Sequence, residues 1–417
     1  MNRITTVRLM LLAIPSTLVA ACDPAPATAT STAVEQLAVP AAPGSQSPNL
    51  AVGQGGVVAL SWVTADETGH RLQYSVLAGN AWSEPRNVAR GDDWFVNWAD
   101  FPSVVPVSGE MWAAHWLVRQ PAGGYAYDVH LSASSDGGAT WSESVMPHDD
   151  NTPTEHGFVT IFPDATGMGL IWLDGRNMAH AASHGPSHHS PTVGMTLRAA
   201  TYSSSLEAAK ETLVDELICD CCQTDVAITA QGAIAVYRNR TKDETRDIYA
   251  ARYVDGEWLP GRAVADDGWT IDGCPVNGPA IAADGDHVAV AWFTAAGDLP
   301  KVRMARSNDS GETWSAAVDV TEGGISGRAG VALLDQGRVA VSWLCGESET
   351  HARLCLRRIG EDNTLGRVHI VSGEDQVPSL SVPQLARSGD AIIASWTARD
   401  GNVTGIRSSR ITVASLR

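Results

Sequence analysis

The chain has 417 residues, 44% of them hydrophobic, and a formal charge of −18 from 29 basic and 47 acidic side chains. This balance argues against nucleic acid as a partner, because neutralising phosphates requires clustered Lys and Arg. Fourteen Trp stand against only five Phe and seven Tyr, which indicates a repeated structural use of tryptophan.

The first 21 residues have the features of a secretory signal. Arg3 and Arg8 precede a short apolar stretch, LMLLAI, and small residues lead to Cys22. The sequence LVAAC resembles the lipobox of bacterial lipoproteins, which implies that Cys22 is acylated and anchors the protein to a membrane. The alternative is an ordinary cleavage site beside a chance cysteine. We therefore expect an extracytoplasmic protein, lipid-anchored in the periplasm or at the cell surface.

Residues 22–47 are rich in Ala, Pro and Thr, and this composition predicts an extended linker. Within it, residues 33–40 include the alternating segment AVEQLAV, which could serve as the outer strand of the last repeat. The globular body is predicted over residues 48–412.

Seven apolar tetrads that end in an aromatic residue recur at intervals of 51 to 65 residues. Short alternating segments and turns surround each tetrad, and only SSLEAAKETLVDEL has the pattern of a short helix. Such self-similarity predicts an all-β fold, a β-propeller of four-stranded blades. Seven blades are expected, with six as the alternative. The aromatic residues are Trp62, Trp116, Trp172, Tyr237, Trp292, Trp343 and Trp396.

Two turns, SSDGGATW and SNDSGETW, share the pattern S-x-D-x-G-x-T-W. Aspartate can accept backbone hydrogen bonds in such a turn, glycine tolerates positive φ and tryptophan can pack beneath it. The pattern resembles the Asp-box, or BNR repeat, of the sialidase superfamily. The residues that carry it are Asp136, Gly138, Trp141, Asp309, Gly311 and Trp314.

The resemblance implies that the Asp-boxes lie opposite the active face. The working face is then built from the loops that enter each blade and the loops that follow the tetrads. On this basis His156, Gln223 and Asn277 are expected to bind ligand at the mouth of the central channel.

Sialidases hold the sugar carboxylate with three arginines and use a Tyr–Glu nucleophile with an Asp acid/base. Asp100 is the best-placed carboxylate for that acid/base role, and Arg176, Arg238 and Arg328 are the candidate guanidiniums. The family's Arg-Ile-Pro motif is absent, and no Tyr–Glu pair is recognisable.

Cysteine use leaves several alternatives open. Cys345 and Cys355 flank a hairpin loop and are predicted to form a disulfide in an oxidising compartment. The remaining thiols are either two disulfides, a metal site or a redox-active pair. Soft thiolates favour copper or zinc, and a His-rich insertion would supply further ligands. The proposed ligands are Cys219, Cys221, Cys222, Cys274, His184 and His188.

The sequence therefore predicts a membrane-anchored, sialidase-like propeller that acts on or binds glycans or acidic sugars at the channel mouth. If it is an enzyme, a glycoside hydrolase is expected. The alternative is a non-catalytic propeller that binds a ligand or partner and carries a Cys/His metal site or a disulfide-stapled site.

Overall fold

The computed structural model describes residues 34–179, 193–321, 325–346 and 352–416. The signal segment, Cys22, His184 and His188 lie outside these residues. Among the described residues, no helix has the length and apolarity needed to cross a membrane.

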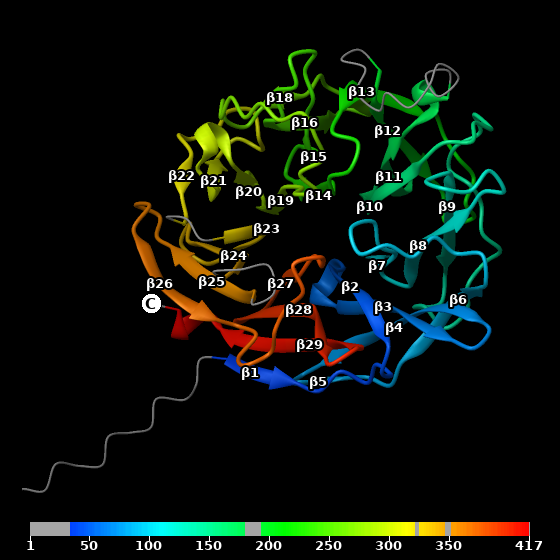
Figure 1. Cartoon of the computed structure of the whole chain (residues 1–417), viewed down its shortest axis with the longest axis horizontal. Helices are drawn as coiled ribbons and strands as arrows, with labels where there is room; N and C mark the ends of the chain where they lie inside the picture. The colour runs from blue at the N-terminus through cyan, green and yellow to red at the C-terminus, as the bar shows by residue number, and fades with distance from the viewer. Residues whose placement is uncertain (1–33, 180–192, 322–324, 347–351, 417) are drawn as a thin grey trace, which may run out of the picture. The chain divides into compact units, whose positions relative to one another are not determined.

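The chain folds into a ring of seven antiparallel sheets, so the predicted seven-bladed propeller is confirmed and the six-bladed alternative is wrong (Figure 1). Among the described residues, blade 2 has three strands, and an isolated β-bridge between Val145 and Leu131 takes the place of the fourth. Blade 1 comprises β2 (Ser45–Val52), β3 (Val58–Asp66), β4 (Gly69–Ala78), β5 (Ala81–Trp82) and β6 (Arg86–Gly91). Blade 2 comprises β7 (Ser103–Ser108), β8 (Met111–Arg119) and β9 (Tyr127–Ser134). Blade 3 comprises β10 (His156–Asp164), β11 (Gly167–Asp174), β12 (Met195–Tyr202) and β13 (Thr212–Ile218).

Blades 4 to 7 follow the same order, with the first strand innermost. Blade 4 comprises β14 (Asp225–Thr229), β15 (Gly232–Arg238), β16 (Ile248–Val254), β17 (Glu257–Trp258) and β18 (Arg262–Ala263), and blade 5 comprises β19 (Ala280–Asp284), β20 (His287–Thr294), β21 (Lys301–Ser307) and β22 (Val318–Asp319). Blade 6 comprises β23 (Ile325–Leu333), β24 (Val339–Cys345), β25 (Arg353–Ile359) and β26 (Leu365–Ile370). Blade 7 comprises β27 (Gln384–Ser388), β28 (Ala391–Asp400) and β29 (Val403–Thr412), with β1 (Val34–Leu37) as its outer strand.

The repeated aromatic residues hold neighbouring blades together. Each lies on the second strand of its blade and belongs to a buried cluster shared with the preceding blade. Trp172, for example, packs with Leu131 of blade 2, and Trp292 packs with Ile234 of blade 4. A single sheet cannot bury both its faces, and the large aromatic side chains fill the space between adjacent sheets.

The N-terminal strand closes the ring. β1 pairs with β29, with Val34 opposite Ile411, and so completes blade 7. This strand lies within residues 33–40, the segment that could serve as the outer strand of the last repeat.

The segment expected to be helical is instead partly a strand. Thr212–Ile218 pairs with β12 as the outer strand of blade 3. Helix propensity is a weak prior, and here the sheet edge overrides it.

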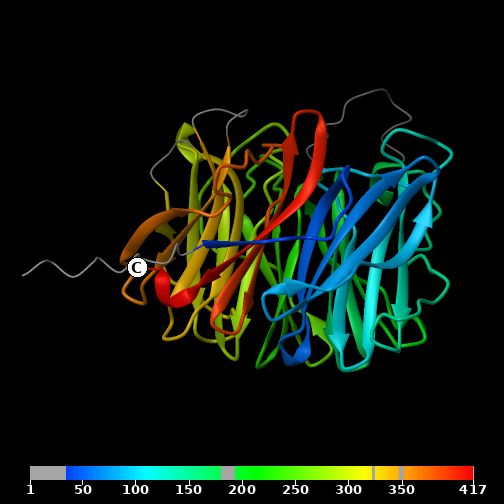
Figure 2. The ribbon, with the colours of Figure 1, turned by 90° about the horizontal axis from the view of Figure 1, so that it is seen from below.

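The two S-x-D-x-G-x-T-W turns have the same hydrogen bonds. Asp136 accepts bonds from the backbone and hydroxyl of Thr140 at 2.9 and 2.6 Å, and Asp309 does the same with Thr313. Both turns follow the third strand of a blade. They therefore lie opposite the loops that join second and third strands, because strands run from one face of the ring to the other (Figure 2).

Candidate functional site

Loops from several blades meet on the working face around Arg328. Its guanidinium lies 4.8 Å from the Trp98 ring, in the loop that enters blade 2. It also donates hydrogen bonds to the carbonyl oxygens of Val276 and Ser379, in the loops that enter blades 5 and 7. We call the surface where these loops meet the mouth.

Asp100, Tyr127 and Glu155 form a buried hydrogen-bonded group on this face. The Tyr127 hydroxyl lies 2.7 Å from Asp100 Oδ2 and 2.7 Å from Glu155 Oε1. Asp100 is 2% exposed, whereas Glu155 is only partly buried, so Glu155 is the member accessible from solvent. The sequence did not reveal that the Tyr127 hydroxyl lies between these two carboxyl groups.

The two carboxyl groups favour their protonated forms. Burial raises the pKa of Asp100 to about 7, although hydrogen bonds from Tyr127 and the Phe158 amide act in the opposite direction. Burial, and then the charges of Asp100, Asp220 and Cys274, raises the pKa of Glu155 to about 8. A neutral tyrosine has one hydroxyl proton and can donate it to only one of its two neighbours. The second short contact therefore needs a proton on one of the two carboxyl groups, which then donates a hydrogen bond to the Tyr127 oxygen at neutral pH.

The backbone at the start of β10 leaves room for the Asp100 carboxylate and the Tyr127 ring. A methyl group at Gly157 would collide with the Asp100 carboxylate and the Tyr127 ring. The next residue, Phe158, adopts φ of 51° in a bulge, and its amide donates to Asp100 Oδ1 at 2.8 Å. Phe95 stacks on Tyr127 with ring centroids 4.0 Å apart and fixes the ring plane. Bulges of this kind are frequent beside functional sites.

Four cysteines lie together near the same face. Cys219 Sγ is 3.0 Å from Cys222 Sγ and 4.0 Å from Cys221 Sγ. A hydrogen bond from Cys221 lowers the pKa of Cys274, which places the more exposed Cys274 beside this trio. All four are free thiols in this structure. Cys345 and Cys355, by contrast, form a disulfide with a Cα–Cα distance of 5.9 Å.

Buried guanidiniums surround the thiols. Arg238 donates to three backbone carbonyl oxygens, those of Arg246, Asn277 and Phe293. It stacks over Trp269 at 4.8 Å and is only 2% exposed. Arg246 pairs with Glu244 and also lies close enough to Cys219 for their charges to interact. No sequence motif marks Arg246.

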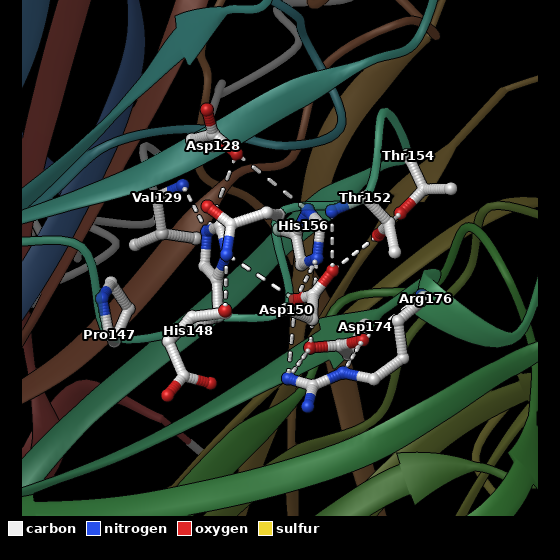
Figure 3. A network of polar contacts seen from close by, with 12 residues as sticks. Asp128, Val129, Pro147, His148, Asp150, Thr152, Thr154, His156, Asp174 and Arg176 are labelled. Carbon is white, nitrogen blue, oxygen red and sulfur yellow. Dashed lines mark hydrogen bonds and ion pairs between the residues drawn. The ribbon is translucent and has the colours of Figure 1, made fainter. Parts of the chain in front are cut away.

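A second polar network lies between blades 2 and 3 (Figure 3). His156 Nε2 is 3.0 Å from Asp150 Oδ2 and 3.8 Å from Asp174 Oδ2, and its ring stacks on His148 at 3.8 Å. His156 is fully buried, so its predicted place at the mouth is wrong. Side chains of successive extended residues point to opposite sides, and it is Glu155 that faces the mouth.

Arg176 also belongs to this network. It forms ion pairs with Asp174 at 2.7 Å and Glu211 at 3.0 Å, so its charge is balanced within the protein. It does not contribute a guanidinium to the mouth.

Gln223 and Asn277 join the working-face loops to one another. The Gln223 amide donates to the Ala99 carbonyl and accepts from the Gly278 amide, at 2.7 and 3.2 Å. Asn277 Oδ1 accepts from the Arg328 amide at 2.9 Å, and its Nδ2 donates to the Pro275 carbonyl. Both side chains predicted to bind ligand thus have partners inside the protein.

No known protein-family model matches the chain, and no curated protein matches it in sequence. Its fold is similar to that of the BP39L lectin from Burkholderia pseudomallei, with a TM-score of 0.57 and 12% identity, covering 88% of this chain and 97% of that one. The NanB sialidase from Streptococcus pneumoniae gives a TM-score of 0.45 at 12% identity, covering 89% and 69%. An α-L-arabinanase from Penicillium chrysogenum, complexed with arabinobiose, gives 0.47 at 13%, covering 77% and 95%. The chain is therefore a seven-bladed propeller similar in fold to a lectin. At these identities the likeness concerns the fold alone.

Proposed function

We propose that this protein is a lipid-anchored, extracytoplasmic glycoside hydrolase whose general acid/base is Glu155. The observation that carries the proposal is the short contact of the Tyr127 hydroxyl with both Asp100 and Glu155. Carboxyl groups with raised pKa values that lie in a loop-built site are typical of catalytic centres.

The geometry supports a division of roles. Glu155 is the accessible carboxyl group, and its pKa of about 8 keeps it protonated at neutral pH. It donates its proton to the glycosidic oxygen as the bond to the anomeric carbon breaks. A water molecule then adds to that carbon and returns a proton to the Glu155 carboxylate. Asp100 and Tyr127 are positioning residues, because they are buried and act through Glu155.

The preference for acidic sugars rests on Arg328. It is the guanidinium that joins the mouth loops, and its Nε has no hydrogen-bond partner in the described residues. A planar guanidinium is suited to a carboxylate of the substrate. Arg176 and Arg238 are excluded from this role because their donors are engaged within the protein.

The test is hydrolysis of a panel of fluorogenic glycosides that includes a sialoside, a uronide and neutral sugars. We expect Glu155→Gln to lower kcat/KM at least 100-fold, because general acid catalysis is typically worth 10²- to 10⁴-fold. Glu257→Gln, at an exposed position on an outer strand, should retain full activity. Glycan binding without hydrolysis of any member of the panel would overturn the enzymatic proposal.

The membrane anchor is tested separately. Acylation of Cys22 predicts that the protein incorporates a labelled fatty acid and sediments with membranes. Cys22→Ser should abolish both. Membrane association that survives this substitution would contradict the lipid anchor.

A further inference from the structure

We propose that Cys219, Cys221 and Cys222, with Cys274 on the solvent side, form a binding site for one thiophilic d¹⁰ cation, Cu(I) or Zn(II). This inference goes beyond the proposed hydrolase. The two proposals share Arg328, so thiolates of a loaded metal site would compete with a substrate carboxylate for its charge.

The sulfur positions suit a shared cation. In a tetrahedral zinc–thiolate site with bonds of about 2.3 Å, sulfurs are about 3.8 Å apart, whereas a disulfide bond is about 2.05 Å. The Cys219–Cys221 separation of 4.0 Å matches the first value. The Cys219–Cys222 separation of 3.0 Å lies between the two, so this pair must open by less than about 1 Å around a cation. Cys219, Cys221 and Cys222 form a group with ligand atoms within 4.8 Å of one another.

The backbone holds the three sulfurs on one side of the turn. The Cys219 amide donates to the Arg238 carbonyl at 2.9 Å, which ties the turn to the end of β15. Asp220 accepts from the Met195 amide at 3.0 Å and pairs with Arg240 at 3.1 Å. The turn is thus anchored by its own carboxylate. Such anchoring preorganises a metal site.

Charge balance favours bound thiolates. Arg238 and Arg328 are buried, and among the described residues neither forms an ion pair with a carboxylate. Both lie close enough to Cys222 for their charges to act on its sulfur. Burying an uncompensated charge is costly. Cu(I) bound by three thiolates, or Zn(II) bound by four, carries a net charge of −2 and would balance two guanidiniums.

Disulfides would leave this charge without compensation. Pairing Cys219 with Cys222 and Cys221 with Cys274 would convert four potential thiolates into two neutral bridges. Arg238 and Arg328 would then remain buried with only carbonyl and aromatic partners. The arginines therefore distinguish a metal site from a pair of structural bridges.

The experiment is metal titration of the full-length mature protein, prepared without oxygen and with a mild reductant. Cu(I) is supplied against a chromophoric competitor, Zn(II) in parallel, and Co(II) reports sulfur ligation by its absorption. We expect one equivalent per chain and a loss of at least 100-fold in affinity in Cys222→Ser. The matched control, Cys345→Ser with Cys355→Ser, removes the disulfide but keeps the four thiols and should bind normally.

Cys274→Ser separates the two cations. A three-coordinate Cu(I) site should keep its affinity within about tenfold, whereas a four-coordinate Zn(II) site should weaken at least 100-fold. Thiol alkylation gives a readout independent of any variant's folding: the wild-type thiols should react in the metal-free protein and be protected after loading. Four blocked thiols in freshly isolated, denatured and unreduced protein, or no stoichiometric binding of either cation, would overturn the proposal.

Discussion

Glu155 and His156 are consecutive in the chain, yet their side chains enter two separate polar networks. Glu155 Oε1 contacts the Tyr127 hydroxyl at 2.7 Å, whereas His156 Nε2 contacts Asp150 at 3.0 Å. The start of β10 thus divides the carboxyl group at the mouth from a buried network between blades 2 and 3. This division allows each network to be altered separately.

Asp100→Asn should shift the alkaline limb of the hydrolysis profile to lower pH. The Asp100 charge is one cause of the raised pKa of Glu155, after burial, so removing it lets Glu155 lose its proton more readily. A general acid is active only while protonated. The measurement is kcat/KM between pH 5 and 9 for both proteins. A profile that keeps the wild-type midpoint would contradict the coupling of these two groups.

The raised pKa of Asp100 also predicts how the stability of the protein depends on pH. Asp100 has a pKa of about 7 in the folded protein and about 3.9 when unfolded, so between these values the folded state binds more protons. The free energy of unfolding should therefore fall as pH rises from about 4 towards 7, by up to about 1.4 kcal/mol per pH unit for this group.

Urea unfolding at pH 5, 6 and 7 measures this slope. Asp100→Asn should flatten it relative to wild type, while contributions from other titrating groups cancel in the comparison. Equal slopes in the two proteins would show that Asp100 is ionised in the folded state throughout this range.

Much of the fold was predictable because it repeats. The seven aromatic residues could be aligned from sequence, and each proved to fill the space between two blades. The outer strand Thr212–Ile218 was mistaken for part of a helix, because its pairing with β12 is a long-range property. Local propensity does not report such pairing.

The site was harder to predict because it depends on side-chain direction. The sequence placed the loop of Glu155 and His156 on the working face but did not specify which of the two points into the mouth. Tyr127 begins β9 after a loop, and only the packing of blades 2 and 3 brings its hydroxyl between Asp100 and Glu155. A bulge with positive φ at Phe158 also changes the alternation of side chains in β10. No sequence pattern marks that bulge.

Gly157→Ala should disrupt the hydrogen-bonded group of Asp100, Tyr127 and Glu155. The new methyl group would meet the Asp100 carboxylate and the Tyr127 ring, neither of which can retreat because both are buried. Overpacking of this kind typically costs about 1–3 kcal/mol. We expect a matching fall in the free energy of unfolding and a loss of hydrolysis. The control is Gly273→Ala, where a methyl group meets no neighbouring atom within 4 Å. Equal stability of the two variants would contradict the close approach at Gly157.

His156→Gln should destabilise the protein more than His148→Gln, although the two rings stack on each other. Burial opposes protonation of His156, but the hydrogen bond to Asp150 and the charges of Asp174, Asp150 and Asp128 raise its pKa. Burial and the neighbouring His156 charge instead lower the pKa of His148 to about 3, so it is neutral. Removing the His156 cation leaves buried carboxylates less compensated, and breaking such a buried pair costs about 3–5 kcal/mol.

The pH dependence of this loss identifies its cause. A histidine whose pKa is raised on folding stabilises the protein fully below its unfolded pKa of about 6.5, and this stabilisation is lost as pH rises through the folded value. The difference in unfolding free energy between wild type and His156→Gln should therefore be largest near pH 5.5 and narrow at alkaline pH. The His148→Gln difference should change in the opposite sense over the same range, because below about pH 6.5 the unfolded chain binds a proton at His148 that the folded protein excludes. If the difference in unfolding free energy between wild type and His156→Gln is constant with pH, then packing, and not charge, holds the two rings between blades 2 and 3.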